Sequence, residues 1–373
     1  MKKALIALAV LGAASGAAMA QSSVTLYGVA DIAIGKATSA GDSKWGAHTN
    51  TIVTNGTSRI GLTGKEDLGG GLWAGFRYES PVNLANGDTT GSKVADGGTG
   101  WSREANVMLG SNAFGLVKLG RSTTPVYDGQ GIYELTGWAN YSVVANTFGY
   151  GANPDPRNNA QIEYITPSFF GVSAALSYVP RAEGVVIDNG ANNRTDRWDF
   201  NLAYNQGPIK AAFTVDKPTH TNGNSGVAAA NRTRSNNANY TLGGSYTFNN
   251  MFALAASYNR ANNAVPWKRS AKSSNYYCDS RNVYLCGEST QFGARRYGWE
   301  LGGSFFMGPF TVTLDLTRDT KNDLYRYANG KQKKYTNGVL EGKYALSKRT
   351  FLYADYLRLD GDNNYGVGLR HNF

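Results

Sequence analysis

Beyond its first twenty residues, this chain of 373 residues has no long apolar run. A membrane-spanning helix needs about 18 or more consecutive apolar residues, so the sequence excludes a helical membrane protein. Cysteine and histidine are also scarce, at 2 and 3 residues. Metal sites built from these residues need close pairs such as Cys-x-x-Cys, and no such pair is present. We expect neither a metal nor any other cofactor.

Catalytic and nucleotide-binding motifs are missing as well. A hydrolase with a histidine base needs an acid and a nucleophile beside that histidine. His48 and His220 lie in polar stretches, and His371 shares a strand face with Phe373. The glycines at 69–71 form a turn into another strand, whereas a phosphate loop leads into a helix. We therefore expect no catalytic residue and no enzymatic activity.

The first twenty residues have the pattern of an export signal. Lys2 and Lys3 precede an apolar run that closes on the small residues at 17–20. This order is typical of a cleaved signal peptide, residues 1–20. Cleavage would leave a mature chain of residues 21–373. It would remove two lysines and no acidic residue, which lowers the net charge from +10 to +8.

The mature chain is basic and uniform in composition. No Pro/Ser-rich linker, charged tail or change in composition divides it, so we expect one domain. Basic proteins often bind nucleic acid, but an exported protein rarely meets it. We expect no nucleic-acid partner, and instead anionic lipid headgroups and anionic solutes.

Apolar residues recur at every second position in one segment after another, which is the period of a β-strand and not of a helix. Near the start, Val24 and Leu26 share a face opposite Thr25 and Asp31. We count sixteen such segments. They span approximately 23–35, 58–66, 71–82, 101–110, 115–121, 158–166, 170–179, 197–205, 208–216, 239–248, 251–260, 297–306, 309–318, 334–346, 349–358 and 364–373.

Tight turns and long polar stretches alternate between these segments. Asn249-Asn250 is one of the turns, and 36–57 and 261–296 are two of the long stretches. Amphipathic strands of about ten residues, with turns at one end and long loops at the other, are typical of outer-membrane β-barrels. In hydrocarbon every backbone N–H and C=O must be paired within the protein, so such a sheet has to close on itself.

A soluble β-sandwich is the competing interpretation. It would need a dry core, whereas the second face of most strands here carries Thr, Ser, Asn, Gly or charged residues, which suits a water-filled lumen. Aromatic residues at strand ends, such as Tyr178 and Trp299, fit the girdles of a membrane interface. The sequence therefore predicts an all-β fold, a transmembrane antiparallel β-barrel of 16 strands with long extracellular loops and short periplasmic turns.

Several motifs resemble the trimeric general porins of Gram-negative bacteria, in particular those of β-proteobacteria. They are Ser-Val-Thr-Leu-Tyr-Gly-Val-Ala-Asp at 23–31, Ser-Arg-Ile-Gly-Leu at 58–62, Glu-Asp-Leu-Gly-Gly-Gly-Leu at 66–72, and the stretch from Phe114-Gly115 to Leu119-Gly120-Arg121. The resemblance covers the mature chain. It implies a homotrimer, a third long loop at 122–156 folded into the lumen, and the terminal Phe373 as an assembly signal.

The same resemblance implies a pore constriction in which arginines on the wall face carboxylates on the infolded loop. The counterparts on the wall are Arg59, Arg121 and Arg157, and those on the loop are Asp128 and Glu134. Strict alternation places Arg59 on the lumen face. It puts Arg121 on the outer face, so a bulge has to bring Arg121 inward. Opposed fixed charges orient polar solutes, and arginine rings favour anions.

The two cysteines, Cys278 and Cys286, both lie in the long polar stretch 261–296. An exported and oxidising setting favours a disulfide between them. Such a bond would stiffen the loop.

Together these observations predict an outer-membrane porin for the passive diffusion of small hydrophilic solutes and ions, with a preference for anions. We expect it to contact outer-membrane lipid, including lipopolysaccharide. Two alternatives stay open. One is a channel specific for a single anionic solute, and the other is a barrel whose long loops also act as an adhesin or receptor.

Overall fold

A computed structural model describes most of the chain. The described residues are 23–39, 42–89, 100–150, 156–180, 196–218, 220–221, 234–235, 238–262, 278–279, 283–285, 295–327 and 331–373. The expected signal peptide, residues 1–20, lies outside them. No helix in this part of the chain has the length and apolar character needed to cross a membrane.

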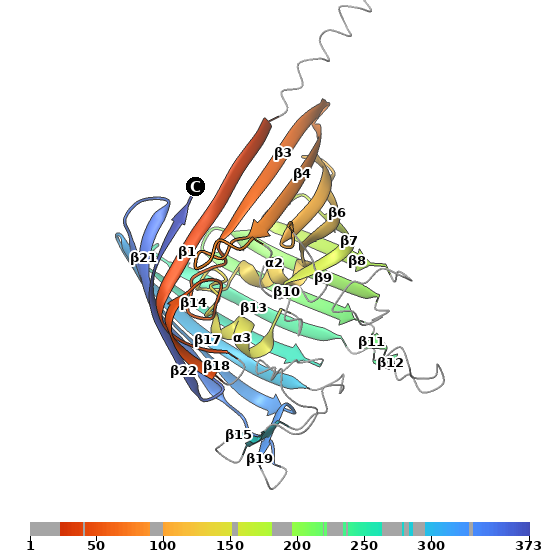
Figure 1. The fold of residues 1–373 in the computed structure, drawn as a ribbon. Helices are drawn as coiled ribbons and strands as arrows, with labels where there is room; N and C mark the ends of the chain where they lie inside the picture. The colour runs from red at the N-terminus through yellow and green to blue at the C-terminus, as the bar shows by residue number, and fades with distance from the viewer. Residues whose placement is uncertain are drawn as a thin grey trace, which may run out of the picture.

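Seventeen strands form a single antiparallel sheet, and sixteen of them close into a barrel (Figure 1). The barrel strands are β1 (Ser23–Ser39), β3 (Arg59–Gly69), β4 (Leu72–Pro81), β5 (Glu104–Ser111), β6 (Gly115–Thr123), β7 (Arg157–Ile165), β8 (Val172–Val179), β9 (Arg197–Gln206), β10 (Ile209–Pro218), β13 (Asn239–Phe248), β14 (Phe252–Ala261), β17 (Arg296–Met307), β18 (Phe310–Asn322), β20 (Thr336–Ala345), β21 (Thr350–Leu359) and β22 (Asp362–Asn372). Strand β1 closes the ring, because its first half pairs with β3 and its second half with β22. The prediction of a closed sixteen-stranded barrel is confirmed.

The seventeenth strand corrects one expectation. Alternation predicts a loop over 36–57, and this is wrong at its start, because β1 continues to Ser39 and forms a hairpin with β2 (Asp42–His48). Among the residues that the structure describes, β2 pairs with β1 alone. Its only apolar residues at alternate positions are Trp45 and Ala47, too few to reveal the period of a strand. Trp45 is 68% exposed, so backbone hydrogen bonds rather than burial hold β2 in place.

Five further short strands lie in stretches that the sequence predicts to be loops. They are β11 (His220–Thr221), β12 (Arg234–Ser235), β15 (Cys278–Asp279), β16 (Val283–Leu285) and β19 (Tyr325–Tyr327). Strands β11 and β12 pair with each other, and β15, β16 and β19 form a small separate sheet. None of them joins the wall of the barrel.

The tight turns use residues that tolerate a left-handed backbone. Asn249 and Asn250 have φ values of 47° and 56°, and Gly207 and Gly308 have values of 60° and 58°. Asparagine and glycine reach this region at little steric cost, and two such residues can join antiparallel strands directly. The turn residues are therefore part of what sets the strand register.

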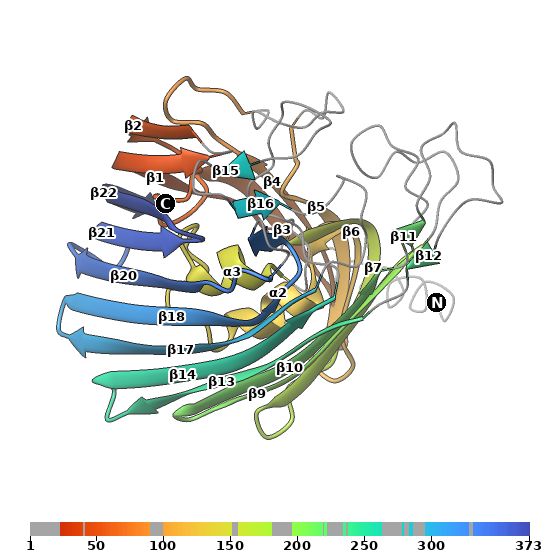
Figure 2. The ribbon, with the colours of Figure 1, turned by 90° about the horizontal axis from the view of Figure 1, so that it is seen from below.

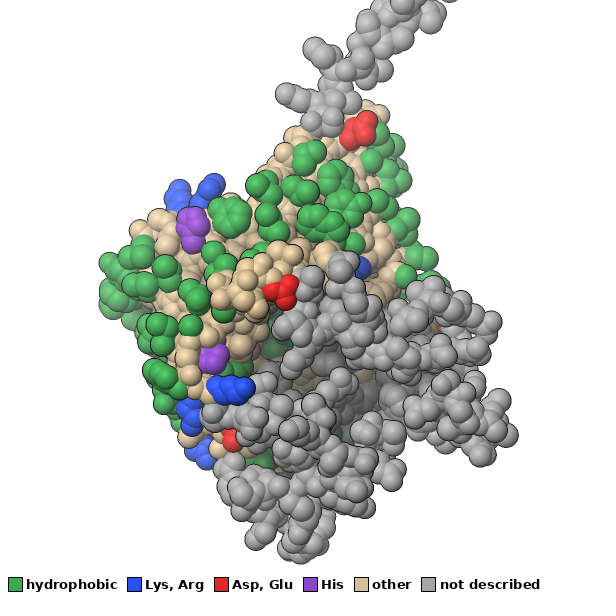
Figure 3. All heavy atoms as spheres, in the orientation of Figure 1, with side chains coloured by type: hydrophobic (Ala, Val, Ile, Leu, Met, Phe, Trp, Pro, Cys, Tyr) green, Lys and Arg blue, Asp and Glu red, His purple; other side chains and the backbone are tan. Residues whose placement is uncertain are grey.

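The two faces of the wall differ in polarity, as the alternation predicts. On the outside, Leu242, Leu314 and Val367 are 62%, 50% and 63% exposed. Their neighbours Thr241 and Thr313 point inward and are buried. Figure 3 shows hydrophobic side chains spread over the outer surface of the strands. This is the polarity of a barrel that faces lipid outside and water inside.

The segment that follows β6 lies inside the ring of strands. Residues 124–150, here called the inner loop, contain the helices α2 (Pro125–Gly131) and α3 (Val143–Phe148), which Figure 2 shows within the barrel. Thr124 and Ser142 cap these helices, because their side chains accept hydrogen bonds from the backbone N–H groups of Tyr127 and Ala145. Helix α2 contacts β9 and β10, and α3 contacts β17 and β18.

An apolar core fills the space between the inner loop and the wall. It includes Tyr141, Val143, Val144 and Phe148 from the loop, and Tyr353, Leu357 and Leu359 from the wall. The wall residues belong to β21, in which apolar residues occupy both faces of the strand. Its inward positions carry apolar side chains because they pack against the inner loop instead of facing water.

Candidate functional site

Three arginines and two glutamates meet on the lumen side of neighbouring strands. Arg59 is the first residue of β3, Arg157 is the first residue of β7, and Arg103 directly precedes β5. Arg59 and Arg103 bind Glu79, with Nε–Oε distances of 3.3 and 2.6 Å. The Nε atom of Arg157 lies 3.6 Å from Oε1 of Glu104. We call these five residues the arginine cluster.

The sheet register explains how the cluster forms. Glu79 of β4 lies directly opposite Glu104 of β5, so two carboxylates stand side by side on the lumen face. Like charges in direct opposition destabilise a strand pair, and here each glutamate has arginine neighbours that offset the repulsion. Tyr27 of β1 adds a hydrogen bond, donating from its hydroxyl to Glu79 at 3.0 Å.

Accessibility differs within the cluster. The side chains of Arg59 and Arg103 are 24% and 15% exposed, whereas that of Glu79 is 9% exposed. Burial, with Arg157 and Arg59 nearby, lowers the pKa of Arg103 to about 10, which leaves it protonated at neutral pH. The side of the cluster that water reaches is therefore mainly cationic.

Arg121 lies beside a bulge, but the extra residue of that bulge is on β7, and Arg121 still pairs with Ala105, between the inward-facing Glu104 and Asn106. The register between β6 and β7 shifts between Gly120 and Ser122. Arg121 donates through Nη1 to Oδ1 of Asn159 at 2.6 Å, and through Nε to the carbonyl of Ser102. These bonds place its guanidinium between β7 and the segment before β5.

The two loop carboxylates have local partners. Asp128 accepts a hydrogen bond from the hydroxyl of Thr123 at 3.1 Å, and burial raises its pKa. Glu134 accepts hydrogen bonds from the Thr136 hydroxyl at 2.6 Å and from the Trp138 backbone at 2.8 Å. Glu134 thus closes a turn of the inner loop. The structure brings Arg59 and Arg157 together with two wall glutamates, and it places Asp128 and Glu134 on the loop itself.

The inner loop also covers a group of wall carboxylates on the far side of the lumen. Glu300, Asp315 and Glu341 are each no more than 2% exposed. The hydroxyl of Tyr141 donates to Glu341 at 2.6 Å and accepts from Asn55 at 2.7 Å. These acids are therefore screened from the open part of the lumen by the loop.

Sequence reasoning missed Glu79, Glu104 and Arg103. The alternation of the strands could have identified the two glutamates as lumen-facing. Glu79 lies on the strand face opposite to that of Tyr78, and Glu104 on the face opposite to that of Ala105. Arg103 precedes its strand, so the period of the strand carries no information about its direction. Only the fold places it beside Glu79.

The carboxyl terminus takes part in closing the barrel. The backbone N–H of Phe373 donates to the carbonyl of Gly28 at 3.0 Å, and the N–H of Gly28 donates back at 3.0 Å. A Cβ at position 28 would lie 2.3 Å from the Phe373 ring, so the terminal ring occupies the space that glycine leaves. The role of Phe373 in assembly stays a prediction.

The predicted disulfide falls partly in a stretch of the chain that the structure does not describe. Cys286 lies outside the described residues. Cys278 begins β15, where only its backbone pairing with Tyr284 is described. The pairing of the two cysteines stays a prediction.

A closed ring of amphipathic strands, apolar outside and polar inside, with a loop folded into the lumen, defines a membrane β-barrel pore. Comparisons with known proteins give the family. The model of the Gram-negative porin family matches residues 7–364. The chain belongs to this family and is an outer-membrane porin, a passive path for small hydrophilic solutes.

Individual relatives agree with that assignment. An outer membrane porin protein of Bordetella pertussis is 30% identical over 420 aligned positions, which cover 100% of both chains. Outer membrane porin protein 32 of Delftia acidovorans is 37% identical over 261 residues, which cover 66% of each chain. Among solved structures, the anion-selective porin from Comamonas acidovorans superposes with a TM-score of 0.67 at 25% identity, over 95% of this chain and 100% of that one.

Proposed function

We propose that this porin prefers anions and that the arginine cluster sets this preference. The observation that carries the proposal is the composition of the cluster. Three guanidinium groups face two carboxylates, and the more exposed side chains are arginines. Fixed positive charge at a narrow aqueous passage raises the local concentration of anions and lowers that of cations.

The inner loop supports the same sign of selectivity. It lies over Glu300, Asp315 and Glu341, whose charges would otherwise attract cations. A buried carboxylate that is hydrogen-bonded to the loop contributes less to the potential in the open lumen than an exposed one. The preference remains weak, because Glu79 and Glu104 offset part of the arginine charge.

The comparisons support this proposal as well. The Comamonas acidovorans structure, which covers nearly the whole of this chain, is described as an anion-selective porin. By the same likeness we propose a homotrimer in contact with lipopolysaccharide. A channel for a single anionic solute and an additional adhesin role of the loops are the alternatives that solute-competition and host-binding assays would reveal.

Reversal potentials across a salt gradient test the proposal. We expect the double variant Arg59→Ala/Arg157→Ala to lose most of the anion preference of the natural protein. The matched control is Arg358→Ala, which removes an exposed arginine from the outward face of β21. Selectivity that is unchanged in the double variant would contradict the proposal.

Screening gives a second readout on the same protein. The Debye length falls from about 10 Å at 0.1 M salt to about 3 Å at 1 M. The anion preference should therefore weaken as the mean salt concentration rises. A preference that does not depend on salt would point to size or specific binding and not to fixed charge.

A further inference from the structure

The inner loop carries six aromatic residues, which divide into two groups. The first group is fully buried and consists of Tyr133, Tyr141 and Phe148. The second group is only half-buried and consists of Tyr127, Trp138 and Tyr150. The buried group anchors the loop to the wall, so anchoring does not account for the half-buried group.

The half-buried residues Tyr127, Trp138 and Tyr150 contact one another, and we call them the aromatic triad. The ring centres of each pair lie 5.0 or 5.1 Å apart. The rings of Tyr127 and Trp138 are nearly parallel, at 15°, and Tyr150 meets them at 63° and 76°. The indole N–H of Trp138 donates to the carbonyl of Tyr127 at 3.0 Å. Stacked and edge-on contacts are the favourable arrangements of aromatic rings, so the triad is a preformed aromatic surface.

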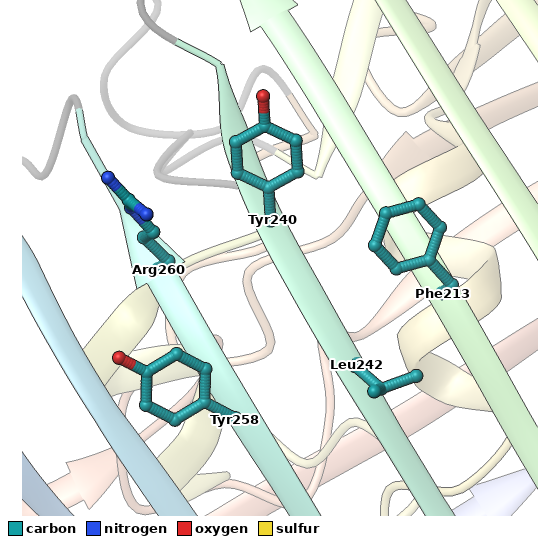
Figure 4. Close-up of a pocket in the computed structure, with 5 residues that line it drawn as sticks. All are labelled: Phe213, Tyr240, Leu242, Tyr258 and Arg260. Atoms are coloured by element: carbon teal, nitrogen blue, oxygen red, sulfur yellow. The ribbon is translucent and has the colours of Figure 1, made fainter.

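The triad borders the lumen and not the lipid. Figure 4 shows the outward position of aromatic rings in this barrel, where Phe213, Tyr240 and Tyr258 line a groove on the outside of the wall. The triad belongs instead to α2 and the loop that follows it, which lie inside the ring of strands (Figure 2). Its exposed parts therefore border the aqueous path.

The triad lies close to the arginine cluster because α2 begins beside Arg157. Thr123 pairs in register with Arg157, and the backbone N–H of Thr124 donates to the carbonyl of Pro156 at 3.0 Å. Tyr127 follows in the first turn of the helix. Burial raises the pKa of the Tyr127 hydroxyl, and the positive charges of all three arginines of the cluster partly offset that rise. The hydroxyl thus lies within the field of the cluster.

We propose that the constriction binds aromatic carboxylates, with the carboxylate on the arginine cluster and the ring against the aromatic triad. Guanidinium groups bind carboxylates through charge-assisted hydrogen bonds, and the triad supplies the ring contacts. The proposal rests on the anion preference proposed above and names the class of anion that the pore favours. Binding has to stay weak, because a pore conducts only those solutes that leave again.

The experiment compares two anions of equal charge and similar size on the purified protein in a planar bilayer. Benzoate has an aromatic ring, and cyclohexanecarboxylate has a saturated one. Each probe is added to potassium chloride, and its apparent Kd is the concentration that halves the reduction of the chloride current at saturation. We expect benzoate to bind about threefold to tenfold more tightly, as one aromatic contact implies. The saturated ring is no less hydrophobic, so burial alone does not favour benzoate.

Variants of Trp138 separate ring contact from loop structure. Trp138→Leu and Trp138→Phe both remove the indole N–H that donates to Tyr127, but only Trp138→Phe keeps an aromatic ring. We expect equal affinity for the two probes in Trp138→Leu, and a retained preference for benzoate in Trp138→Phe. The readout is a ratio of two affinities in one variant, so a general change of the pore cancels.

The matched control is Tyr258→Leu, which removes an aromatic ring from the outward face of β14 (Figure 4). It should keep the natural ratio of the two affinities. The double variant Arg59→Ala/Arg157→Ala should bind both probes at least about tenfold more weakly, since each carboxylate loses charged hydrogen-bond donors.

Three results would overturn the proposal. They are equal affinity of the natural protein for both probes, a natural ratio in Trp138→Leu, and loss of the ratio in both Trp138 variants. Its failure is distinct from a failure of the proposed function. Equal affinity for the two probes, with chloride still preferred over potassium, would contradict the aromatic site alone, whereas a preference for potassium would contradict the anion preference itself.

Discussion

At the scale of single residues, Glu79 is the carboxylate that two of the three arginines of the cluster share. It binds Arg59, Arg103 and Tyr27. Removing its charge leaves the two guanidinium groups without their shared carboxylate. Both the stability of the barrel and its selectivity depend on this one side chain.

We predict that Glu79→Gln increases the anion preference and destabilises the barrel by about 2 kcal/mol, the order expected when a buried charged hydrogen-bond partner is lost. Reversal potentials and denaturant unfolding in detergent measure the two effects. The control is Glu66→Gln, a change to an exposed carboxylate on β3. A shift toward cations in the Glu79 variant would show that the cluster does not act through its net charge.

Some residues of this site could be predicted from the sequence, and others could not. Motif and alternation placed Arg59 on the lumen face. Arg121 needed a bulge in β6, whereas the register shift beside Gly120 adds its extra residue to β7 and leaves Arg121 paired with Ala105. The ion pairs themselves could not be predicted, because Glu79 and Arg103 are separated by a turn and a long segment whose path only the fold determines. Contacts across neighbouring strands require the register, and the sequence does not give it.

At the scale of elements, the position of the inner loop depends on a few anchors. Tyr141 is fully buried and its hydroxyl connects Asn55 to Glu341. Helices α2 and α3 have only seven and six residues, too few to be stable without such contacts. The lumen is narrowed only as long as these anchors hold the loop.

We predict that Tyr141→Phe loosens the inner loop, because it leaves Glu341 without its hydroxyl donor. Single-channel recordings should show larger current fluctuations, and the barrel should lose about 1–3 kcal/mol of stability. Tyr356→Phe is the control, since that hydroxyl bonds Asn363 at the rim of the barrel. Equal noise in both variants would mean that Tyr141 does not anchor the loop.

The two cysteines give a second test at this scale. We predict a disulfide between Cys278 and Cys286, since both lie in one exported loop. Intact mass after alkylation, with and without prior reduction, distinguishes the two states. Two alkylated thiols in the unreduced protein would refute the bond.

The elements themselves were largely predictable. Period-two alternation and turn residues such as Asn249-Asn250 predicted the sixteen barrel strands to within a few residues. Strand β2 was not predicted because only two of its residues, Trp45 and Ala47, mark an apolar face. The short helices were not predicted because the loop around them is irregular. Apolar residues on both faces of β21 blur the period of that strand, and they mark the place where the inner loop packs. Such a deviation becomes informative only when its partner is known.

At the scale of the whole molecule, closure of the barrel follows from backbone chemistry, whereas assembly does not. Every wall strand pairs on both sides, as a sheet in hydrocarbon requires. The number of barrels in the assembly is not set by this requirement. It depends on which part of the outer surface meets a second copy.

We predict that three barrels assemble and conduct independently. In a planar bilayer, one inserted unit should then close in three equal steps under high voltage. Chemical cross-linking in detergent gives an independent count of the subunits. Closure in a single step, with cross-linking to no more than one subunit, would contradict the trimer.

The central claim is that this chain forms a water-filled pore whose constriction favours anions. The most direct test is the zero-current potential of the purified protein in a planar bilayer with a tenfold gradient of potassium chloride. We predict stepwise ohmic conductance and a potential whose sign is set by chloride. A potential set by potassium would contradict the anion preference, and the absence of any conductance would contradict the pore itself.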